Sequence, residues 1–331
     1  MGVPLARTER PWGSAEDVWG VEADHPECHC ASVVSLPGAG GERLVAAWYA
    51  GSAECRPDVA VFVATRDGAG AWSPATVVVD TPGQPDGNPV LGVSPGGRLW
   101  LIFATLDGPR WDSCRLRRMH SADGGRTWSP PEPLPGAEPG WLVRNKPIAQ
   151  GRAWLLPVYD EVAWNGFVLR SSDDGESWSA GGRIVAETGC IQPTLLPEAD
   201  PDPDPEGLAA LLRCGRRGGP LWISRSVDGG RHWSGVAPTP LHNPNSGCDA
   251  VARPDGTWLL ACNDGPDRRV LALRLSRDGG RTWPGRWILA EGEREYSYPA
   301  LIPAADGGLH LLYTHERRSI RHLHLAPGWP A

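Results

Sequence analysis

The sequence predicts an all-β chain folded as a six-bladed β-propeller, and two internal repeats carry this prediction. The first repeat is the pattern Ser/Thr-x-Asp-x-Gly-x-Thr/Ser-Trp, which recurs along the chain together with one degenerate copy. A period of about 50 residues is typical of architectures in which each repeat unit is one small sheet. The copies of the pattern end at Trp72, Trp128, Trp178, Trp233 and Trp283.

Aspartate and glycine at this spacing favour a tight hairpin turn, because the carboxylate accepts from nearby backbone N–H groups and glycine adopts positive φ. We interpret Asp123, Asp173, Asp228 and Asp278 as turn-building residues rather than as metal ligands or catalytic acids. A residue needed once per active site is not usually repeated around a fold. The tryptophan after each turn starts a strand and is expected to pack between neighbouring sheets.

The second repeat consists of six short apolar strands that each follow a glycine, each with another strand before it. These six units predict four-stranded antiparallel blades, but the sixth unit runs out of chain after its third strand, residues 318–325. We therefore expect an N-terminal strand at about residues 16–22 to complete blade six and close the ring, within a single domain spanning residues 1–331. The aligned positions of the preceding strands are Ala31, Pro89, Pro147, Pro193, Ala250 and Pro299.

Composition excludes several classes of partner. The net charge of −7 argues against nucleic acid or an anionic membrane surface. No stretch approaches the roughly 20 apolar residues of a membrane span, and the N-terminus lacks the apolar core of a secretion signal. We therefore expect a cytoplasmic monomer with reduced cysteines that binds a small, acidic molecule or sugar and uses no cofactor. A metal site at Cys28-His29-Cys30 is disfavoured, because alternating strand residues point to opposite faces.

A polar ring is predicted at the channel. Polar residues on the most buried strand of a blade are costly unless they form hydrogen bonds. Either these groups satisfy one another with channel water, or they bind a ligand; their chemical diversity favours a ligand. The residues directly before the aligned positions are Cys30, Asn88, Lys146, Gln192, Asp249 and Tyr298.

Further polar side chains stand at the ends of the second strands and on the approach loops. Carboxylates, arginines, a tyrosine and a histidine around one axis suit an acidic ligand rich in hydroxyl groups. The candidate binding residues from these segments are Arg144, Glu161, Arg213, Asn245, Asn263 and Arg317, and they join Asn88, Lys146, Gln192 and Asp249 of the ring.

Over nearly its whole length the chain resembles the Asp-box (BNR-repeat) sialidase-like proteins, and within them the bacterial predicted neuraminidases. The resemblance lies in the Asp turns and in segments such as CHCASVV, GNPVL, RNKPI, IQP, NPNSG and EYSYPA. It implies a propeller whose catalytic tyrosine is Tyr298, with Tyr296 as the less favoured choice. It further implies Asp58 or Glu54 as acid/base, and Arg213 and Arg269 as arginines that clamp a substrate carboxylate.

The chain departs from the sialidase pattern at two places. His29 stands where sialidases carry an arginine on the first inner strand. No glutamate is placed to pair with Tyr298; Gln192 is the nearest inner-strand residue, and Glu161 or Glu295 would have to substitute.

Three functions follow from these observations. The first is a glycosidase acting on an acidic sugar, where a tyrosine nucleophile avoids repulsion between two anions. The second is a lyase, isomerase or biosynthetic tailoring enzyme, in which His29 or Tyr298 removes a proton α to a carboxylate neutralised by Arg213, Arg269 or Lys146. The third is a non-catalytic carbohydrate-binding propeller.

Overall fold

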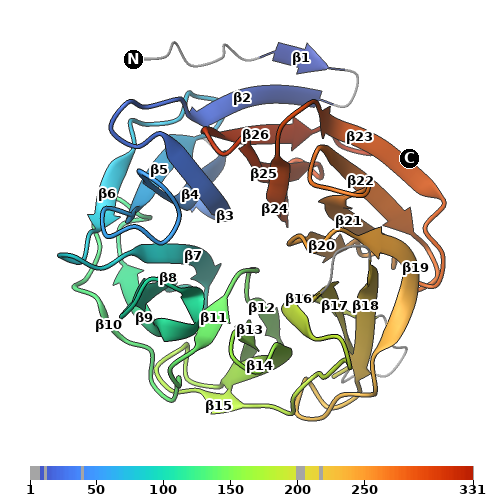
Figure 1. Ribbon diagram of the computed structural model, residues 1–331. Coiled ribbons are helices and arrows are strands. Elements are labelled where there is room, and N and C mark those ends of the chain that lie inside the picture. Colours follow the sequence, from blue (N-terminus) through green and yellow to red (C-terminus); the bar gives the residue numbers. More distant parts are fainter. Residues whose placement is uncertain (1–7, 11–12, 39–40, 199–205, 216–218, 331) are drawn as a thin grey trace.

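The computed structural model describes residues 8–10, 13–38, 41–198, 206–215 and 219–330. They form six antiparallel blades arranged in a ring around a central channel (Figure 1), which confirms the predicted six-bladed β-propeller. Among these residues, no helix is long and apolar enough to cross a membrane.

Blades one, two, four and five each contain four strands in meander order, with the first strand innermost. Blade one comprises β3 (Glu27–Gly38), β4 (Gly41–Gly51), β5 (Ala60–Asp67) and β6 (Thr76–Val79). Blade two comprises β7 (Asp86–Val93), β8 (Leu99–Leu106), β9 (Cys114–Ser121) and β10 (Glu132–Pro133). Blade four comprises β16 (Cys190–Pro197), β17 (Leu208–Cys214), β18 (Gly219–Ser226) and β19 (Ala237–Asn243). Blade five comprises β20 (Asp249–Ala252), β21 (Trp258–Asn263), β22 (Val270–Ser276) and β23 (Gly285–Glu291).

Blade three has an interrupted inner strand. Two short strands, β11 (Trp141–Val143) and β12 (Ile148–Gln150), both pair with β13, and residues 144–147 between them leave the ladder. The blade continues outward through β13 (Ala153–Asp160), β14 (Asn165–Ser171) and β15 (Ser179–Ala180).

Blade six is closed by the N-terminal segment, as predicted. From the channel outward it contains β24 (Tyr296–Pro303), β25 (Leu309–His315), β26 (Ser319–Leu325), β2 (Gly13–Trp19) and β1 (Thr8–Arg10). The closing strand β2 pairs antiparallel with β26 and lies three residues earlier in the chain than expected (Figure 1). Because β2 pairs with the outer edge of β26, the two ends of the chain lie in one sheet and the ring of blades is closed.

The Asp turns have the geometry predicted for them. In the first of them, Asp123 Oδ1 accepts hydrogen bonds from Ser121 Oγ (2.9 Å) and the Thr127 backbone N–H (2.9 Å). Asp173, Asp228 and Asp278 repeat this arrangement. Bonds from the Ser177 hydroxyl and backbone lower the pKa of Asp173 to about 2, so this carboxylate stays ionised while it holds its turn.

Among the described residues, six apolar clusters each lie between two adjacent blades, and a seventh, smaller one packs beside the channel around Tyr298. The tryptophans that end the five Asp-turn copies each join the cluster between their own blade and the preceding one. Blade six has no such turn, and between it and blade five Trp329 packs beside Trp287, with ring centroids 5.7 Å apart. The repeated tryptophan is therefore a wedge that fixes the spacing between neighbouring sheets.

A buried polar network joins blade six to blade one where the ring closes. His310 and His322 share a hydrogen bond of 2.9 Å, and the outer ring nitrogens bond Glu42 (2.8 Å) and Glu16 (3.0 Å). Arg66 donates to the same Glu16 oxygen at 2.6 Å. The network thus links β2, β4, β5, β25 and β26 at the closure.

We predict that this network makes the fold sensitive to acid. Burial lowers the pKa of His322 to about 4 despite Glu16, so the unfolded chain binds the proton first as pH falls. The stability supplied by neutral His322 is complete above about pH 6.5 and is lost progressively towards pH 4, by up to about 3 kcal/mol. Denaturant unfolding of wild type and His322→Gln across this range should give converging stabilities as pH falls; parallel profiles would contradict the prediction.

Candidate functional site

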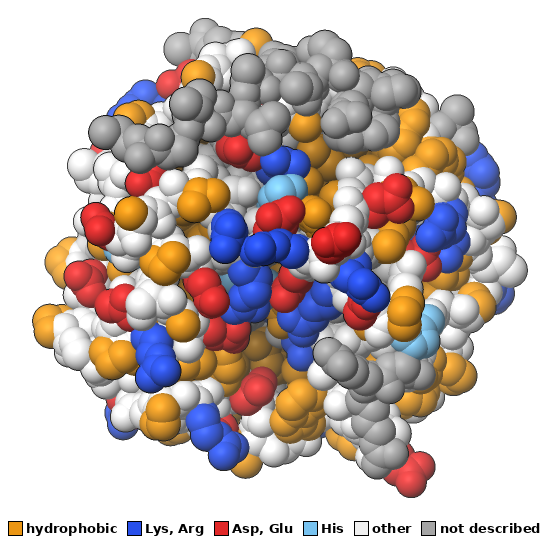
Figure 2. Space-filling model, turned by 45° about the horizontal axis from the view of Figure 1, so that its top comes forward, with side chains coloured by type: hydrophobic (Ala, Val, Ile, Leu, Met, Phe, Trp, Pro, Cys, Tyr) orange, Lys and Arg blue, Asp and Glu red, His pale blue; other side chains and the backbone are white. Residues whose placement is uncertain are grey.

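The candidate site is a cavity of about 190 Å³ at one end of the channel. In a meander blade, the loops between second and third strands lie on the face opposite the turns between third and fourth strands, so the cavity lies away from the Asp turns. Figure 2 shows basic and acidic side chains gathered over the middle of one face. The lining residues are His29, Tyr49, Glu54, Asn88, Trp111, Tyr159, Glu161, Ile191, Gln192, Arg213, Arg268 and Tyr298.

A shared bulge turns the inner-strand side chains toward the axis. In β3, β7, β16 and β24 the register with the second strand shifts by one residue at the same place. The bulged residues adopt left-handed backbone conformations, with φ of 61° at Cys30, 47° at Asn88, 55° at Gln192 and 52° at Tyr298. Bulges redirect a side chain out of the strand's alternation, and here Asn88, Gln192 and Tyr298 line the cavity, whereas Cys30 is buried against Tyr49, Val59 and Tyr298.

Tyr298 lies at the centre of the polar contacts. Arg213 Nη1 donates to the Tyr298 phenol oxygen at 2.8 Å and to Gln192 Oε1 at 3.1 Å. The Tyr298 ring is flanked by further cations, since the guanidinium carbons of Arg144 and Arg268 lie 5.1 and 5.2 Å from its centroid. On the opposite side, Asn88 donates to the Tyr159 hydroxyl at 3.2 Å.

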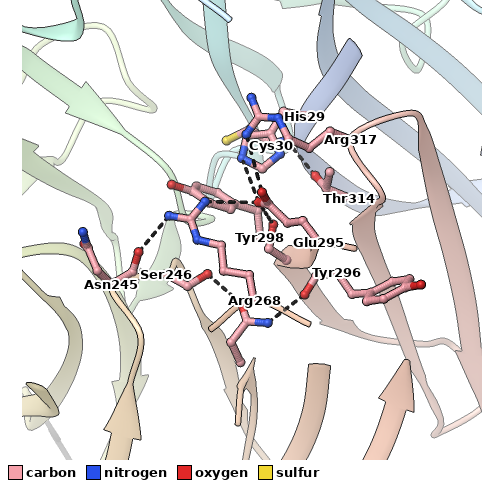
Figure 3. A network of polar contacts seen from close by, with 12 residues as sticks. His29, Cys30, Asn245, Ser246, Arg268, Glu295, Tyr296, Tyr298, Thr314 and Arg317 are labelled. Carbon is pink, nitrogen blue, oxygen red and sulfur yellow. Dashed lines mark hydrogen bonds and ion pairs between the residues drawn. The ribbon is translucent and has the colours of Figure 1, made fainter. Parts of the chain in front are cut away.

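Arg268 is the second arginine of the cavity, and it is already paired with a carboxylate. Its Nη1 donates to Glu295 Oε1 at 3.1 Å, and its Nη2 donates to the backbone oxygen of Asn245 at 2.8 Å. Figure 3 shows the Glu295 carboxylate between the guanidinium groups of Arg268 and Arg317, whose Nη1 lies 3.9 Å from Glu295 Oε2. A ligand carboxylate bound here would compete with Glu295 for Arg268.

His29 is neutral in this environment. Burial, followed by the charges of Arg317, Arg268, Arg144 and Arg213, holds the pKa of the imidazole well below its usual range. Its ring centroid lies 4.2 Å from that of Tyr298, and Nδ1 has no hydrogen-bond partner among the described residues. A neutral imidazole in contact with a tyrosine can donate or accept a hydrogen bond without adding charge, whereas taking up a proton is disfavoured in this buried, cationic setting.

Two carboxyl groups line the cavity, and they differ in their hydrogen bonding. Glu54 bonds Trp111 Nε1 (2.8 Å) and Arg317 Nη2 (2.5 Å). Glu161, on the loop after β13, has no side-chain hydrogen bond to the described residues, and burial raises its pKa to about 7 although the charge of Arg213 opposes the shift. A carboxyl group that titrates near neutrality is suited to give or take a proton.

The floor of the cavity is filled by protein. Arg144 leaves the gap in the inner strand of blade three and donates across the channel to the backbone oxygens of Pro299 (2.9 Å) and Ala31 (3.4 Å). Lys146 Nζ lies 2.7 Å from Asp249 Oδ1 and joins blade three to blade five. These predicted binding residues, Arg144, Lys146 and Asp249, lie outside the cavity lining and tie the blades together.

Other predicted site residues also lie elsewhere. Asp58 is exposed and holds its own turn by accepting from Ser52 N and Oγ, both at 2.8 Å. Arg269, predicted to clamp a carboxylate, pairs with Asp267 on the surface, and its neighbour Arg268 reaches the cavity instead. Asn263 is buried and accepts from Ser246 Oγ at 2.6 Å. The alternative tyrosine, Tyr296, bonds Glu316 and is not in the lining.

The remaining predicted residues meet as expected from their places in the blades. Tyr298, Glu54, His29, Asn88, Glu161, Gln192 and Arg213 all line the cavity. Arg317 bonds Glu54, and Asn245 bonds Arg213.

Sequence reasoning missed three aromatic residues of the lining. Tyr49 and Tyr159 lie on second strands, where large side chains are hard to distinguish from core. The available signal is their position near a polar loop, since Tyr49 lies two residues before the end of β4 and Tyr159 one residue before the end of β13. Trp111 lies in a short 3-10 helix, η1 (Trp111–Ser113), after β8 and carries no such pattern.

Among the described residues, no group of three or more His, Cys, Asp or Glu side chains is placed to hold a metal ion. The side chains that line the cavity supply phenols, an imidazole, carboxyl groups and two arginines.

A family model, the BNR repeat-like domain, matches residues 42–311. The chain belongs to this family. A search of curated proteins finds no match.

Solved structures of similar fold are numerous but distant in sequence. Hadza microbial sialidase Hz136 is 20% identical, with a TM-score of 0.79, and the match covers 94% of this chain and 68% of that chain. An unknown-function protein from Dyadobacter fermentans is 18% identical (TM-score 0.74; 96% and 100% covered). The NanB sialidase from Streptococcus pneumoniae is 11% identical (TM-score 0.76; 92% and 70% covered). At these identities the likeness shows a sialidase-like fold.

We predict that Glu161→Gln stabilises the protein at alkaline pH. The raised pKa means that the folded protein keeps a proton that the unfolded chain releases above about pH 4.5, so wild-type stability falls between pH 4.5 and 7. Allowing for partial solvation, the loss is about 1–2 kcal/mol. The variant should melt higher than wild type at pH 8 and equally at pH 4.5, whereas exposed Glu138→Gln, the control, should change neither value.

Proposed function

We propose that the protein cleaves a glycosidic bond next to a carboxylated sugar, acting at the cavity on a single terminal residue. One observation carries the proposal: the Tyr298 phenol oxygen accepts from Arg213 at 2.8 Å inside a cavity that a second arginine also lines. A nucleophile and a carboxylate-binding cation thus lie in direct contact, as a reaction at the carbon next to a carboxylate requires.

The two arginines of the cavity favour a negatively charged ligand. Arg213 donates through Nε and Nη1 to protein atoms, and its Nη2 has no bond to the described residues. Arg268 can exchange Glu295 for a ligand oxygen. Arginine binds planar carboxylates with two parallel hydrogen bonds, so an acidic sugar fits this pair better than a neutral one.

The cavity's size limits what enters it. About 190 Å³ is below the roughly 300 Å³ at which clefts for larger ligands begin. One sugar ring therefore fits best, with any leaving group at the mouth beside Trp111 and Glu54. This supports action at a chain end rather than within a polymer.

The residues can perform the reaction in two steps. The Tyr298 oxygen bonds to the anomeric carbon as the glycosidic C–O bond breaks, Glu161 gives its proton to the leaving oxygen, and Glu295, which shares Arg268 with the Tyr298 ring, accepts the phenol proton. Water then attacks the same carbon, giving its proton to Glu161, and the phenol leaves with the proton returned by Glu295. A neutral nucleophile is favoured because the sugar itself is anionic.

A second candidate function is favoured by a different observation. No carboxylate bonds the Tyr298 phenol among the described residues, and neutral His29 stands where a third clamping arginine would be expected. Such a pair suits removal of the proton α to a carboxylate that Arg213 neutralises, followed by loss of a β-substituent. A uronide would then be cleaved by elimination and would gain a carbon–carbon double bond.

We predict that purified protein hydrolyses a fluorogenic α-sialoside between pH 5 and 8. Tyr298→Phe should lower kcat by at least about 100-fold, because it removes the reacting oxygen and keeps the ring. Glu161→Gln should abolish the alkaline limb of the pH profile near pH 7.

Three results would contradict the proposed hydrolysis. Undiminished turnover in Tyr298→Phe would exclude the phenol as nucleophile. Ultraviolet absorbance from an unsaturated product, formed from uronides but not sialosides, would support elimination. Binding of acidic sugars without turnover of either class would indicate a carbohydrate-binding propeller.

A further inference from the structure

The loop between β19 and β20 is held rigidly by its own side chains. Asn243 Nδ2 donates to the Ser246 backbone oxygen at 2.9 Å, and Asn243 Oδ1 accepts from the Ser246 N–H at 3.1 Å. Ser246 Oγ in turn donates to Asn263 Oδ1 at 2.6 Å. All three residues are buried, so residues 243–247 form a fixed platform rather than a mobile loop.

This platform presents Asn245 to both cavity arginines. Arg213 Nε donates to Asn245 Oδ1 at 2.7 Å, and Arg268 Nη2 donates to the Asn245 backbone oxygen at 2.8 Å. The two cations come from different blades, at the end of β17 and on the loop after β21. Like charges brought together repel, and two acceptors on one residue offset that repulsion without neutralising either cation.

The contact fixes the plane of the Arg213 guanidinium. Asn245 holds the Nε edge, while Gln192 and Tyr298 both accept from Nη1. Acceptors at two separate nitrogens leave little freedom of rotation about the side chain. The remaining donor, Nη2, is thereby directed by the protein before any ligand arrives.

The backbone at Asn245 adopts a conformation that allows both arginine contacts. Asn245 has φ of 56°, a left-handed conformation that asparagine tolerates better than most residues. Two residues on, a Cβ added to Gly247 would lie 3.1 Å from Gln192 Oε1 and 3.3 Å from Tyr298 Cδ1. The loop therefore packs directly against the residues that Arg213 bonds.

We propose that Asn245 is a positioning residue that locks Arg213 against Tyr298 and sets the geometry of the carboxylate-binding pair. The inference rests on the proposed function for its ligand class. It adds that the acid affinity of the site depends on a neutral side chain that bonds Arg213. Aspartate at this position would hold Arg213 equally well and would repel an anionic ligand.

The test compares Asn245→Gly, which keeps the left-handed backbone and removes the acceptor, with Asn245→Asp, which keeps the acceptor. Asn165→Gly, in another blade, is the control. For Asn245→Gly we expect both kcat and the affinity for N-acetylneuraminate to fall about tenfold or more. For Asn245→Asp, kcat should largely recover while KM stays raised. Melting temperatures and a crystal structure of each variant accompany these measurements.

The crystal structures decide the inference even if the proposed function fails. Arg213 should leave hydrogen-bond distance of Tyr298 in Asn245→Gly and return in Asn245→Asp. If Arg213 stays in place in Asn245→Gly, or if that variant loses only thermal stability, Asn245 has no positioning role. If wild type neither binds nor cleaves any acidic sugar, the proposed function is wrong, and the movement of Arg213 still supports or overturns the positioning role.

Discussion

The left-handed bulge in the inner strands is the constraint on which the site depends. A regular strand would send alternate side chains into the spaces between blades, where the apolar clusters lie. By inserting one residue at the same level in β3, β7, β16 and β24, the chain brings Asn88, Gln192 and Tyr298 into the cavity lining, with Cys30 packed behind Tyr298. Each costs about 1–2 kcal/mol for a left-handed, non-glycine conformation. Four such costs in one ring are tolerated where the surrounding sheets over-determine the backbone.

Blades three and five lack this bulge, and their inner strands instead supply residues that support the floor of the cavity. Blade three opens its inner strand and sends Arg144 beneath the Tyr298 ring, while Lys146 bonds Asp249 of blade five. The cavity therefore has a solid, cationic floor. Burial first, and then this concentration of positive charge, keeps His29 neutral, since protonating it would add one more cation to a buried group. The neutral imidazole and the free face of Arg213 are consequences of the same arrangement.

The fold could be predicted because its signals are local. Each Asp turn is built within a few residues by Asp123 or its counterparts, and each tryptophan wedge follows directly. The inner-strand ring was also predictable, because Asn88, Gln192 and Tyr298 share one position in a repeat. Loop residues were predicted unevenly. Glu54 and Glu161 line the cavity, but nothing local distinguishes Arg268 from Arg269, and only Arg268 enters it. Asp58 was predicted at the site but lies outside the cavity lining. Its carboxylate accepts from Ser52 in a local turn, and sequence spacing does not reveal that contact.

The central claim is that a carboxylate is recognised by Arg213 and Arg268, whatever reaction follows. Calorimetric binding of N-acetylneuraminate and of its methyl ester to the wild-type protein at pH 7 tests this claim directly. The two ligands differ only in the charge and acceptor capacity of the group that the arginines bind. The account predicts that the free acid binds at least about tenfold more tightly than the ester, as charge-assisted hydrogen bonds require. Equal affinity for acid and ester, or no binding of either by folded protein, would contradict it.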